Sequence, residues 1–221
     1  MFYETRDFSR DRMKALGLSH DPMKAIIAPR PIGWISSMSA AGVVNLAPYS
    51  FFNAASTDPP MVFFGANGAH EADDGEKDTL RNVRETGEFV CNLATWDLRM
   101  AMNDSSAPAP RGVDEMDAVG LEKLPSRVVK VPRVAGAPAH LECTLHQCVE
   151  LPVEKSGKRN VMVIGRVVAV HIDDAFIVGG RFDTARARPI GRLGYYDYAV
   201  VDSLFAIQRP AWPIPGRKAA R

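Results

Sequence analysis

Two neighbouring stretches, Arg30-Pro31-Ile32-Gly33-Trp34-Ile35-Ser36-Ser37 and Asn45-Leu46-Ala47-Pro48-Tyr49-Ser50-Phe51-Phe52-Asn53, decide how this chain folds. Apolar and small residues alternate between positions 26 and 39, and prolines in strands are confined to strand starts and sheet edges, so a strand is predicted from near Ile32. The second stretch places hydroxyls, an amide and aromatic rings beside one another near a sheet end. Such a surface suits a small, flat, phosphorylated ligand.

Turn signals divide this region into strands. Ala40-Ala41-Gly42 predicts a hairpin turn and Val43 to Leu46 the returning strand, with regular pairing expected to end before Pro48. Thr57-Asp58-Pro59-Pro60 predicts another turn, and the apolar run Met61 to Phe64 predicts a strand buried on both faces. Three strands joined by short turns favour an antiparallel meander that closes into a barrel over a βαβ fold.

The later elements are mostly strands. A helix of two to three turns is predicted from Lys77-Asp78-Thr79, with Asp78 or Thr79 as its cap and Gly87 as its stop. Alternation from Glu88 to Leu93 predicts a half-buried strand. A second helix is expected within 96–102 and one more helical turn within 113–121. The long segments 139–151 and 160–172 predict a two-stranded ribbon whose charged tip lies at 154–159.

Composition limits the function classes. The chain has 221 residues, 46% of them hydrophobic, which is enough for a full core in a single domain spanning 1–221, with a lead-in arm at 1–25 and a Pro-rich tail at 206–221. Its net charge of +1 argues against nucleic acid or a membrane as partner and favours a small molecule. No apolar run reaches the length of about 18 residues that a membrane helix needs, and a cytoplasmic location is expected.

Common catalytic and metal motifs are missing. The sequence contains neither G-x-G-x-x-G at a helix start nor the P-loop and G-x-S-x-G patterns. Cys143, His146 and Cys148 resemble a metal cluster, but on a strand Cys143 and Cys148 differ in parity and are expected on opposite faces, so core packing is the preferred interpretation. Together with Cys91, these cysteines are expected to be free thiols.

Lys77-Asp78-Thr79 admits two interpretations. A helix N-terminus with exposed N–H groups, a hydroxyl and an ammonium is an anion site. The same residues also suit an ordinary capped surface helix. Likewise Ser36 and Ser37 could fill a solvent-facing strand, and Tyr49 with Phe51 and Phe52 could be core residues. The occurrence of three such segments in one chain favours a binding site.

Taken together, these segments resemble the flavin reductase-like, FMN-binding split barrels of the flavoredoxin type. The resemblance rests on the two stretches above, on Pro59-Pro60-Met61-Val62, on Lys77-Asp78-Thr79 leading into Asn82, and on Arg192-Leu193-Gly194 before Tyr198. It covers about residues 26 to 200, in the family's order. It implies a mainly β fold, a six-stranded antiparallel Greek-key split barrel with a few short helices, usually a homodimer with FMN at the subunit interface.

The resemblance also implies a binding site. Ser36, Ser37, Lys77, Asp78 and Thr79 would surround the phosphate and ribityl chain of FMN. Further residues, namely Tyr49, Ser50, Phe51 and Asn53, would lie along the isoalloxazine ring. The family often has a second glycine after Arg-Leu-Gly, and here Tyr195 takes its place, which is expected to reshape the substrate side of the pocket.

The implied activity is NAD(P)H-dependent reduction of flavin, without an obligatory catalytic acid or base. In such proteins the flavin carries hydride and electrons while the protein supplies position and electrostatics. Two alternatives stay open: an FMN-binding electron carrier or flavin-holding module without its own NAD(P)H activity, and a reductase of another acceptor such as a metal complex or quinone. The sequence contains no recognisable nicotinamide motif that identifies the donor.

Overall fold

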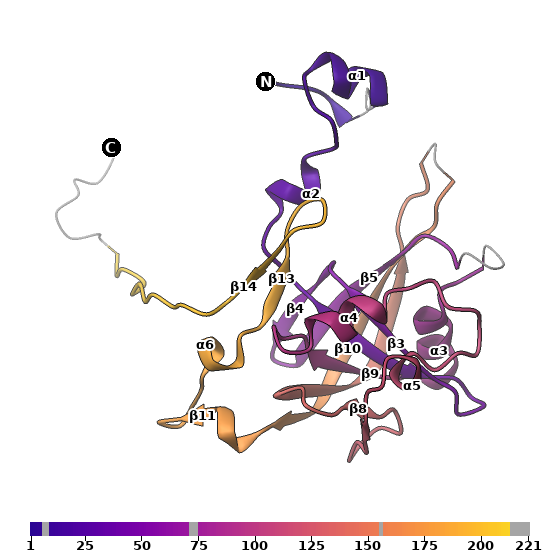
Figure 1. The fold of residues 1–221 in the computed structure, drawn as a ribbon, viewed down its shortest axis with the longest axis vertical. Coiled ribbons are helices and arrows are strands. Elements are labelled where there is room, and N and C mark those ends of the chain that lie inside the picture. Colours follow the sequence, from indigo (N-terminus) through magenta and orange to yellow (C-terminus); the bar gives the residue numbers. More distant parts are fainter. Residues whose placement is uncertain (6–8, 71–74, 155–156, 213–221) are drawn as a thin grey trace.

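The computed structural model describes residues 1–5, 9–70, 75–154 and 157–212. Its main sheet has the strand order β3-β2-β6-β9-β10-β5-β4, and every neighbouring pair is antiparallel. The strands, drawn in Figure 1, are β2 (Gly33–Met38), β3 (Val44–Tyr49), β4 (Phe52–Thr57), β5 (Pro60–Asn67), β6 (Glu88–Leu93), β9 (Ala139–Glu150) and β10 (Asn160–Ile172).

One bent segment closes the barrel. β3 and β4 are separated only by Ser50 and Phe51, and β3 pairs with β2 while β4 pairs with β5. Counted as one strand, they give the expected six-stranded antiparallel barrel, which is confirmed; the bend produces the seventh strand. The prediction that regular pairing ends before Pro48 is wrong, because Pro48 lies opposite Trp34 within β3. β3 stands at the end of the strand order, where the missing N–H of a proline is tolerated.

Two predictions of strand burial are wrong. β5 is not buried on both faces: Val62 is buried, whereas Met61 is partly exposed, because only one face of β5 lies inside the barrel. β6 is not half-buried, because Val90 on its other face packs against Val129 and Val131.

Aromatic and aliphatic side chains fill the barrel. The rings of Tyr49 and Phe64 are 4.9 Å apart, and those of Phe64 and Phe89 are 5.5 Å apart. Packing is tight at Gly165, where an added Cβ would lie 2.3 Å from the Phe89 ring. Helix α3 (Asp78–Thr86) contributes Leu80 and Val83 to this core. It ends at Gly87, as predicted.

A second layer covers the outer face of β2 and β3. It consists of α4 (Arg99–Asp104), α5 (Glu115–Ala118), β7 (Lys123–Leu124) and β8 (Arg133–Val134). Trp34 of β2 and Met102 of α4 are buried in the core between this layer and the sheet. The helical turn expected within 113–121 is confirmed. The helix expected within 96–102 begins later, at Arg99. Trp96 precedes it, and its N–H bonds to the carbonyl of Arg188.

The N-terminal arm projects from the barrel beside a small sheet (Figure 1). It carries two short helices, α1 (Arg10–Ala15) and α2 (Met23–Ile26). The small sheet has the order β1-β13-β14, with β1 (Arg30–Pro31), β13 (Ile190–Arg192) and β14 (Tyr198–Val200). The remaining elements are η2 (Asp174–Phe176), β11 (Ile177–Val178), β12 (Arg181–Phe182) and α6 (Thr184–Ala187).

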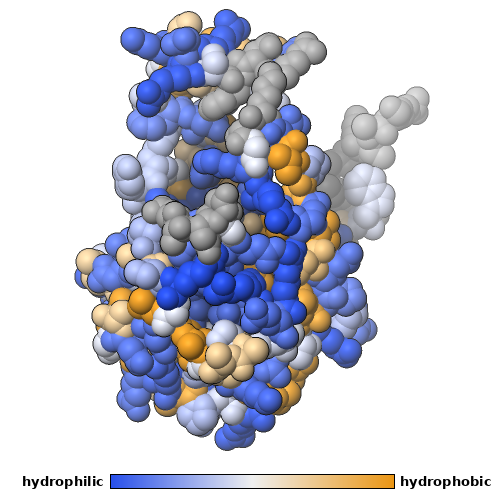
Figure 2. Space-filling model, turned by 90° about the vertical axis from the view of Figure 1, so that its right-hand side faces the viewer, coloured by the Kyte–Doolittle hydropathy of each residue, from blue (hydrophilic) through white to orange (hydrophobic). Residues whose placement is uncertain are grey.

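Two expected features lie partly outside the described residues: the charged ribbon tip, at 155–156, and the Pro-rich tail, at 213–221. Among the helices that the structure describes, none is long and apolar enough to span a membrane. The face shown in Figure 2 is mainly hydrophilic, and its hydrophobic residues form small separate patches.

The prediction that the two cysteines of β9 lie on opposite faces of the strand is wrong. Ile164 of β10 pairs with Gln147 and Gly165 with Leu145, so β9 contains one extra residue between them. This bulge shifts the alternation, and both Cys143 and Cys148 pack against the barrel core. All three cysteines are free, and no group of three or more potential metal ligands occurs in the described part of the chain.

Candidate functional site

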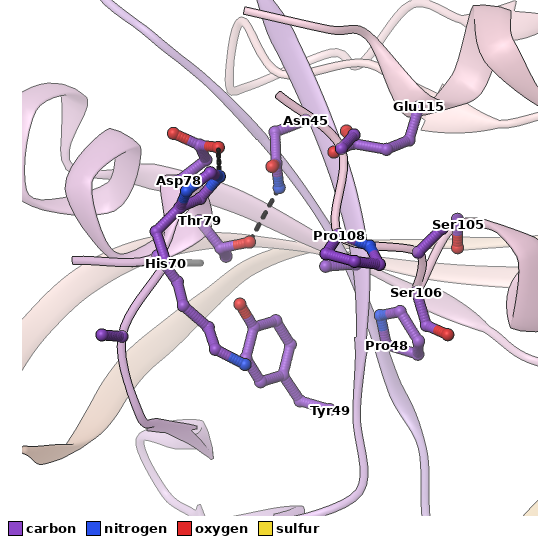
Figure 3. A pocket seen from close by; sticks show the side chains of 15 residues that line it. Asn45, Pro48, Tyr49, His70, Asp78, Thr79, Ser105, Ser106, Pro108 and Glu115 are labelled. Carbon is purple, nitrogen blue, oxygen red and sulfur yellow. Dashed lines mark hydrogen bonds and ion pairs between the residues drawn. The ribbon is translucent and has the colours of Figure 1, made fainter. Parts of the chain in front are cut away.

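A cleft of about 280 Å³ lies between β3, the start of α3 and the loop at 105–109 that follows α4. Figure 3 shows His70, Asp78, Thr79 and Tyr49 on one side, with Glu115, Ser105 and Ser106 on the other. The cleft therefore joins segments that are far apart in the sequence, and the barrel together with its covering layer positions them.

The start of α3 forms one end of the cleft. Lys77 is the N-cap residue and makes no side-chain capping bond, so the prediction that Asp78 or Thr79 caps the helix is wrong. The first N–H groups of a helix have no intrahelical acceptor, and they carry the positive end of its dipole. Because Lys77, Asp78 and Thr79 all line the cleft, this end combines a helix N-terminus with an ammonium group.

The carboxylate of Asp78 is surrounded by basic groups. Its oxygens lie 2.7 Å from Arg81 Nη2, 2.5 Å from Arg111 Nη1 and 3.2 Å from His70 Nε2. These partners offset the negative charge that Asp78 brings to the helix start. An anion bound beside Lys77 would consequently meet a neutral or positive surface.

Hydroxyl and amide groups line the wall next to this end. Asn45 Nδ2 donates to Thr79 Oγ1 at 2.7 Å, and the Tyr49 hydroxyl is also hydrogen-bonded to Thr79. Burial raises the pKa of Tyr49 to about 12; the Thr79 bond opposes this shift, and the charges of Glu115 and Asp78 add to it. Tyr49 is therefore a neutral hydroxyl at physiological pH.

Glu115 makes the opposite side of the cleft acidic. Its Oε2 accepts the N–H of Leu46 at 2.9 Å. Burial raises the pKa of Glu115, the Leu46 bond opposes this, and the charges of Asp78 and Asp114 raise it further. The electrostatic gradient across the cleft thus directs an anionic group toward Lys77 and away from Glu115.

The loop after α4 supplies a third wall. Ser105 is buried, accepts Trp34 Nε1–H at 3.0 Å and donates to the carbonyl of Met102 at 2.9 Å. Ser106 Oγ donates to the carbonyl of Asn103 at 2.6 Å. These bonds hold the small and proline residues of 107–109 against the cleft. The wall that they form is largely apolar.

Comparison with known proteins identifies the family. The family model described as flavin reductase like domain matches residues 24–189, most of the chain. The chain belongs to the flavin reductase-like family. An uncharacterised protein of Halalkalibacterium halodurans is 35% identical over 184 residues, which are 83% of this chain and 87% of that protein.

Solved structures agree with the fold. Nitrilotriacetate monooxygenase component B from Bacillus cereus superposes with a TM-score of 0.81 at 29% identity, covering 94% of this chain and 98% of that one. The Pseudomonas fluorescens 2-nitrobenzoate 2-nitroreductase NbaA gives a TM-score of 0.77 at 26% identity, covering 96% and 98%. A putative flavin reductase with split barrel domain from Shewanella frigidimarina gives a TM-score of 0.75 at 18% identity, covering 95% of this chain and 99% of that one. Together with the family match, this confirms the resemblance to flavin reductase-like split barrels.

Within this flavin reductase-like fold, four of the nine predicted site residues meet at the cleft: Tyr49, Lys77, Asp78 and Thr79. Ser36 and Ser37 do not line it. Ser36 is buried on the outer face of β2, where its Oγ donates to the carbonyl of Pro132 at 2.7 Å, and Ser37 is buried on the other face, where it accepts Asn82 Nδ2–H at 3.2 Å. Their hydroxyls join layers of the protein.

The bend after β3 carries the other three predicted residues out of the cleft. Ser50 lines an adjoining depression, and the Phe51 ring lies 5.8 Å from the Arg30 guanidinium. Asn53 is exposed on β4, and its Oδ1 accepts the N–H of Ala54 at 2.8 Å. Each of these side chains therefore has a different environment from that of Tyr49.

Sequence reasoning missed several residues that line the cleft. Asn45 belongs to the stretch that predicted the site, and its position next to a hairpin turn was an available signal. His70, Ser105, Ser106 and Glu115 carry no local signal, since only the tertiary fold brings them to β3.

Proposed function

We propose that this protein binds FMN in the cleft and reduces flavin with hydride from NADH or NADPH. The observation that carries the proposal is the start of α3, where Lys77 and the first helical N–H groups meet at one end of a cleft. A helix N-terminus with an adjacent ammonium is suited to a phosphate dianion. A flavin reductase-like fold makes FMN the phosphate-bearing ligand to test first.

The chemistry of the cleft fits the parts of FMN. Lys77 and the helix start would hold the phosphate, and the pairing of Asp78 with Arg81 and Arg111 removes a charge that would otherwise repel it. The Asn45 amide and the Thr79 hydroxyl offer donors and acceptors to a polyol chain. The apolar wall of 107–109 and the ring of Tyr49 suit a flat aromatic system.

Bound flavin would supply the hydride chemistry, and this chain's own residues would bind and orient it. The buried Tyr49 hydroxyl, held by Thr79, is a fixed neutral group and not a general base. The likeness to a protein named 2-nitrobenzoate 2-nitroreductase supports reductive chemistry in this fold.

We further propose a cytoplasmic homodimer. Exposed apolar side chains in the C-terminal segment support dimerisation: Phe205 is 89% exposed, Ile207 82% and Trp212 79%. Exposed apolar residues gathered in one segment favour burial against a partner. Light scattering at micromolar concentration tests this assembly, and a monomer that binds flavin fully would contradict it.

The central experiment is spectroscopic and kinetic. The purified protein should show the absorbance of oxidised flavin, or acquire it on titration with FMN at one equivalent per chain. Oxidation of NADH and NADPH should then be followed with FMN in excess. Stoichiometric flavin binding without NADH or NADPH oxidation would identify a flavin carrier instead, and absence of flavin binding would refute the proposal.

A further inference from the structure

A second depression, of about 250 Å³, adjoins the cleft and shares Pro48 and Ser106 with it. Three basic residues line it, Lys24 from α2, Arg30 from β1 and Arg192 from β13. None of the described residues that line it is acidic. We call it the basic depression.

Arg30 carries an unsatisfied donor there. Its side chain is buried, with the residue only 6% exposed, and its Nη atoms donate to the carbonyls of Lys24, Ile27 and Leu193, the last at 2.9 Å. Its Nε, also buried, has no hydrogen-bond partner among the described residues. An unpaired buried donor is costly and calls for an explanation such as a ligand.

A second arginine faces Arg30 across the sheet. Arg192 is its direct antiparallel partner, so both side chains project from the same face of the small sheet. Burial lowers the pKa of Arg30, and the neighbouring charge of Arg192 lowers it further. Like charges placed directly opposite each other destabilise a strand pair, and an anion between them would relieve the repulsion.

Aromatic groups flank these cations. The Arg192 guanidinium lies 4.5 Å from the centre of the Tyr198 ring and donates to the carbonyl of Tyr195. Tyr195 has a positive φ of 57°, the conformation for which a glycine is favoured, and its ring contacts that of His20 at 5.4 Å. The departure from the family's second glycine thus places a tyrosine at the rim of the basic depression.

We infer that the basic depression binds the anionic group, a phosphate or carboxylate, of the second substrate that exchanges hydride with flavin in the adjoining cleft. That the anion belongs to a substrate rests on the proposed function, whereas anion binding by Arg30 and Arg192 rests on the geometry alone. Tyr195 and Tyr198 suit an aromatic or heteroaromatic portion attached to the anion. A nicotinamide dinucleotide and an aromatic carboxylate acceptor both carry this chemistry.

The main test variant is Arg192→Gln, because Arg192 makes fewer structural bonds than Arg30. The matched control is Arg181→Gln, an exposed arginine of the β11–β12 hairpin. Each protein is titrated calorimetrically with benzoate, with its neutral analogue benzamide and with inorganic pyrophosphate, in the presence of saturating FMN. KM and kcat for NADH and NADPH are measured in parallel.

Arg192→Gln should weaken benzoate or pyrophosphate binding about tenfold or more, as expected for the loss of one charge-assisted hydrogen bond. Benzamide binding and FMN affinity should stay within about twofold of the wild type. Weakened pyrophosphate binding with a raised KM for NADH or NADPH identifies the dinucleotide as the source of the anion, and weakened benzoate binding alone identifies a carboxylate acceptor.

The inference is overturned if wild-type protein binds neither anion, or if Arg192→Gln behaves like Arg181→Gln in every titration. Failure of the proposed function looks different: FMN does not bind, or NADH and NADPH are not oxidised. In that event the titrations are repeated without FMN, and they still decide whether the basic depression binds anions.

Discussion

Replacement of Lys77 by alanine should weaken FMN binding but spare riboflavin, which lacks the phosphate. A charge-assisted hydrogen bond contributes about 1.5–3 kcal/mol, and because Lys77 is partly exposed, solvent screening places the expected loss near the lower end, about 1–2 kcal/mol. That loss corresponds to roughly 5- to 30-fold in the dissociation constant. The helix N-terminus stays in place in the variant and should retain the remaining phosphate affinity.

Quenching of flavin fluorescence measures both dissociation constants in one assay. Lys130→Ala is a matched control, since Lys130 is an exposed lysine outside the cleft. Raising the salt concentration should reduce the difference between wild type and Lys77→Ala, because salt screens the ion pair. Equal losses for FMN and riboflavin would show that Lys77 does not contact a phosphate, and would remove the start of α3 from the binding site.

Three further outcomes follow from the structure. Glu142 accepts hydrogen bonds from the N–H groups of residues 127–129 and from His171. Burial raises the pKa of Glu142, but these bonds outweigh burial and lower the pKa to about 2. Because this pKa lies below that of the unfolded chain, Glu142 stabilises the fold above about pH 4.5, and roughly 3 kcal/mol should be lost as the pH falls toward 2. Urea unfolding between pH 7 and 2 should show this loss in wild type and a flatter profile in Glu142→Gln. Gly165→Ala should lower the free energy of unfolding by about 1–3 kcal/mol, since its Cβ would overlap the Phe89 ring, and chemical denaturation with an unaltered m value would measure it; an unchanged midpoint would refute the packing argument. Asn53→Ala should leave the flavin reduction potential within about 10 mV, because Asn53 is exposed on β4, and a shift of about 30 mV, equivalent to 1.4 kcal/mol, would return it to the site.

Local signals predicted the fold more completely than the site. The turn at Gly42, the start of α3 near Lys77 and the stop at Gly87 depend on neighbouring residues and could be read from the sequence. The hydroxyls of Ser36 and Ser37 could not be assigned in this way. Ser36 bonds to Pro132, 96 residues further along the chain, and no local pattern specifies that partner.

Irregularities of the strands account for much of the remaining difference between the predicted and the observed positions of side chains. One extra residue in β9 places Cys143 and Cys148 against the same core, although their spacing predicts opposite faces. The bend between β3 and β4 separates Tyr49 from Asn53, although both belong to one short stretch. Periodicity assigns a face correctly only as long as the strand continues without a bulge or a bend.

The bend at Ser50 and Phe51 also links ligand binding in the cleft to the local opening of β4. The barrel is closed by a single segment that changes partners there, from β2 to β5, so closure requires order on both sides of the bend. A ligand held against Pro48 and Tyr49 would favour the paired state of β3, and by mass action it would disfavour local opening of β4 as well. Protection of the β3 and β4 amides from hydrogen exchange should therefore increase as ligand occupies the cleft. A ligand bound on one side of the bend would in this way stabilise the closure of the whole barrel.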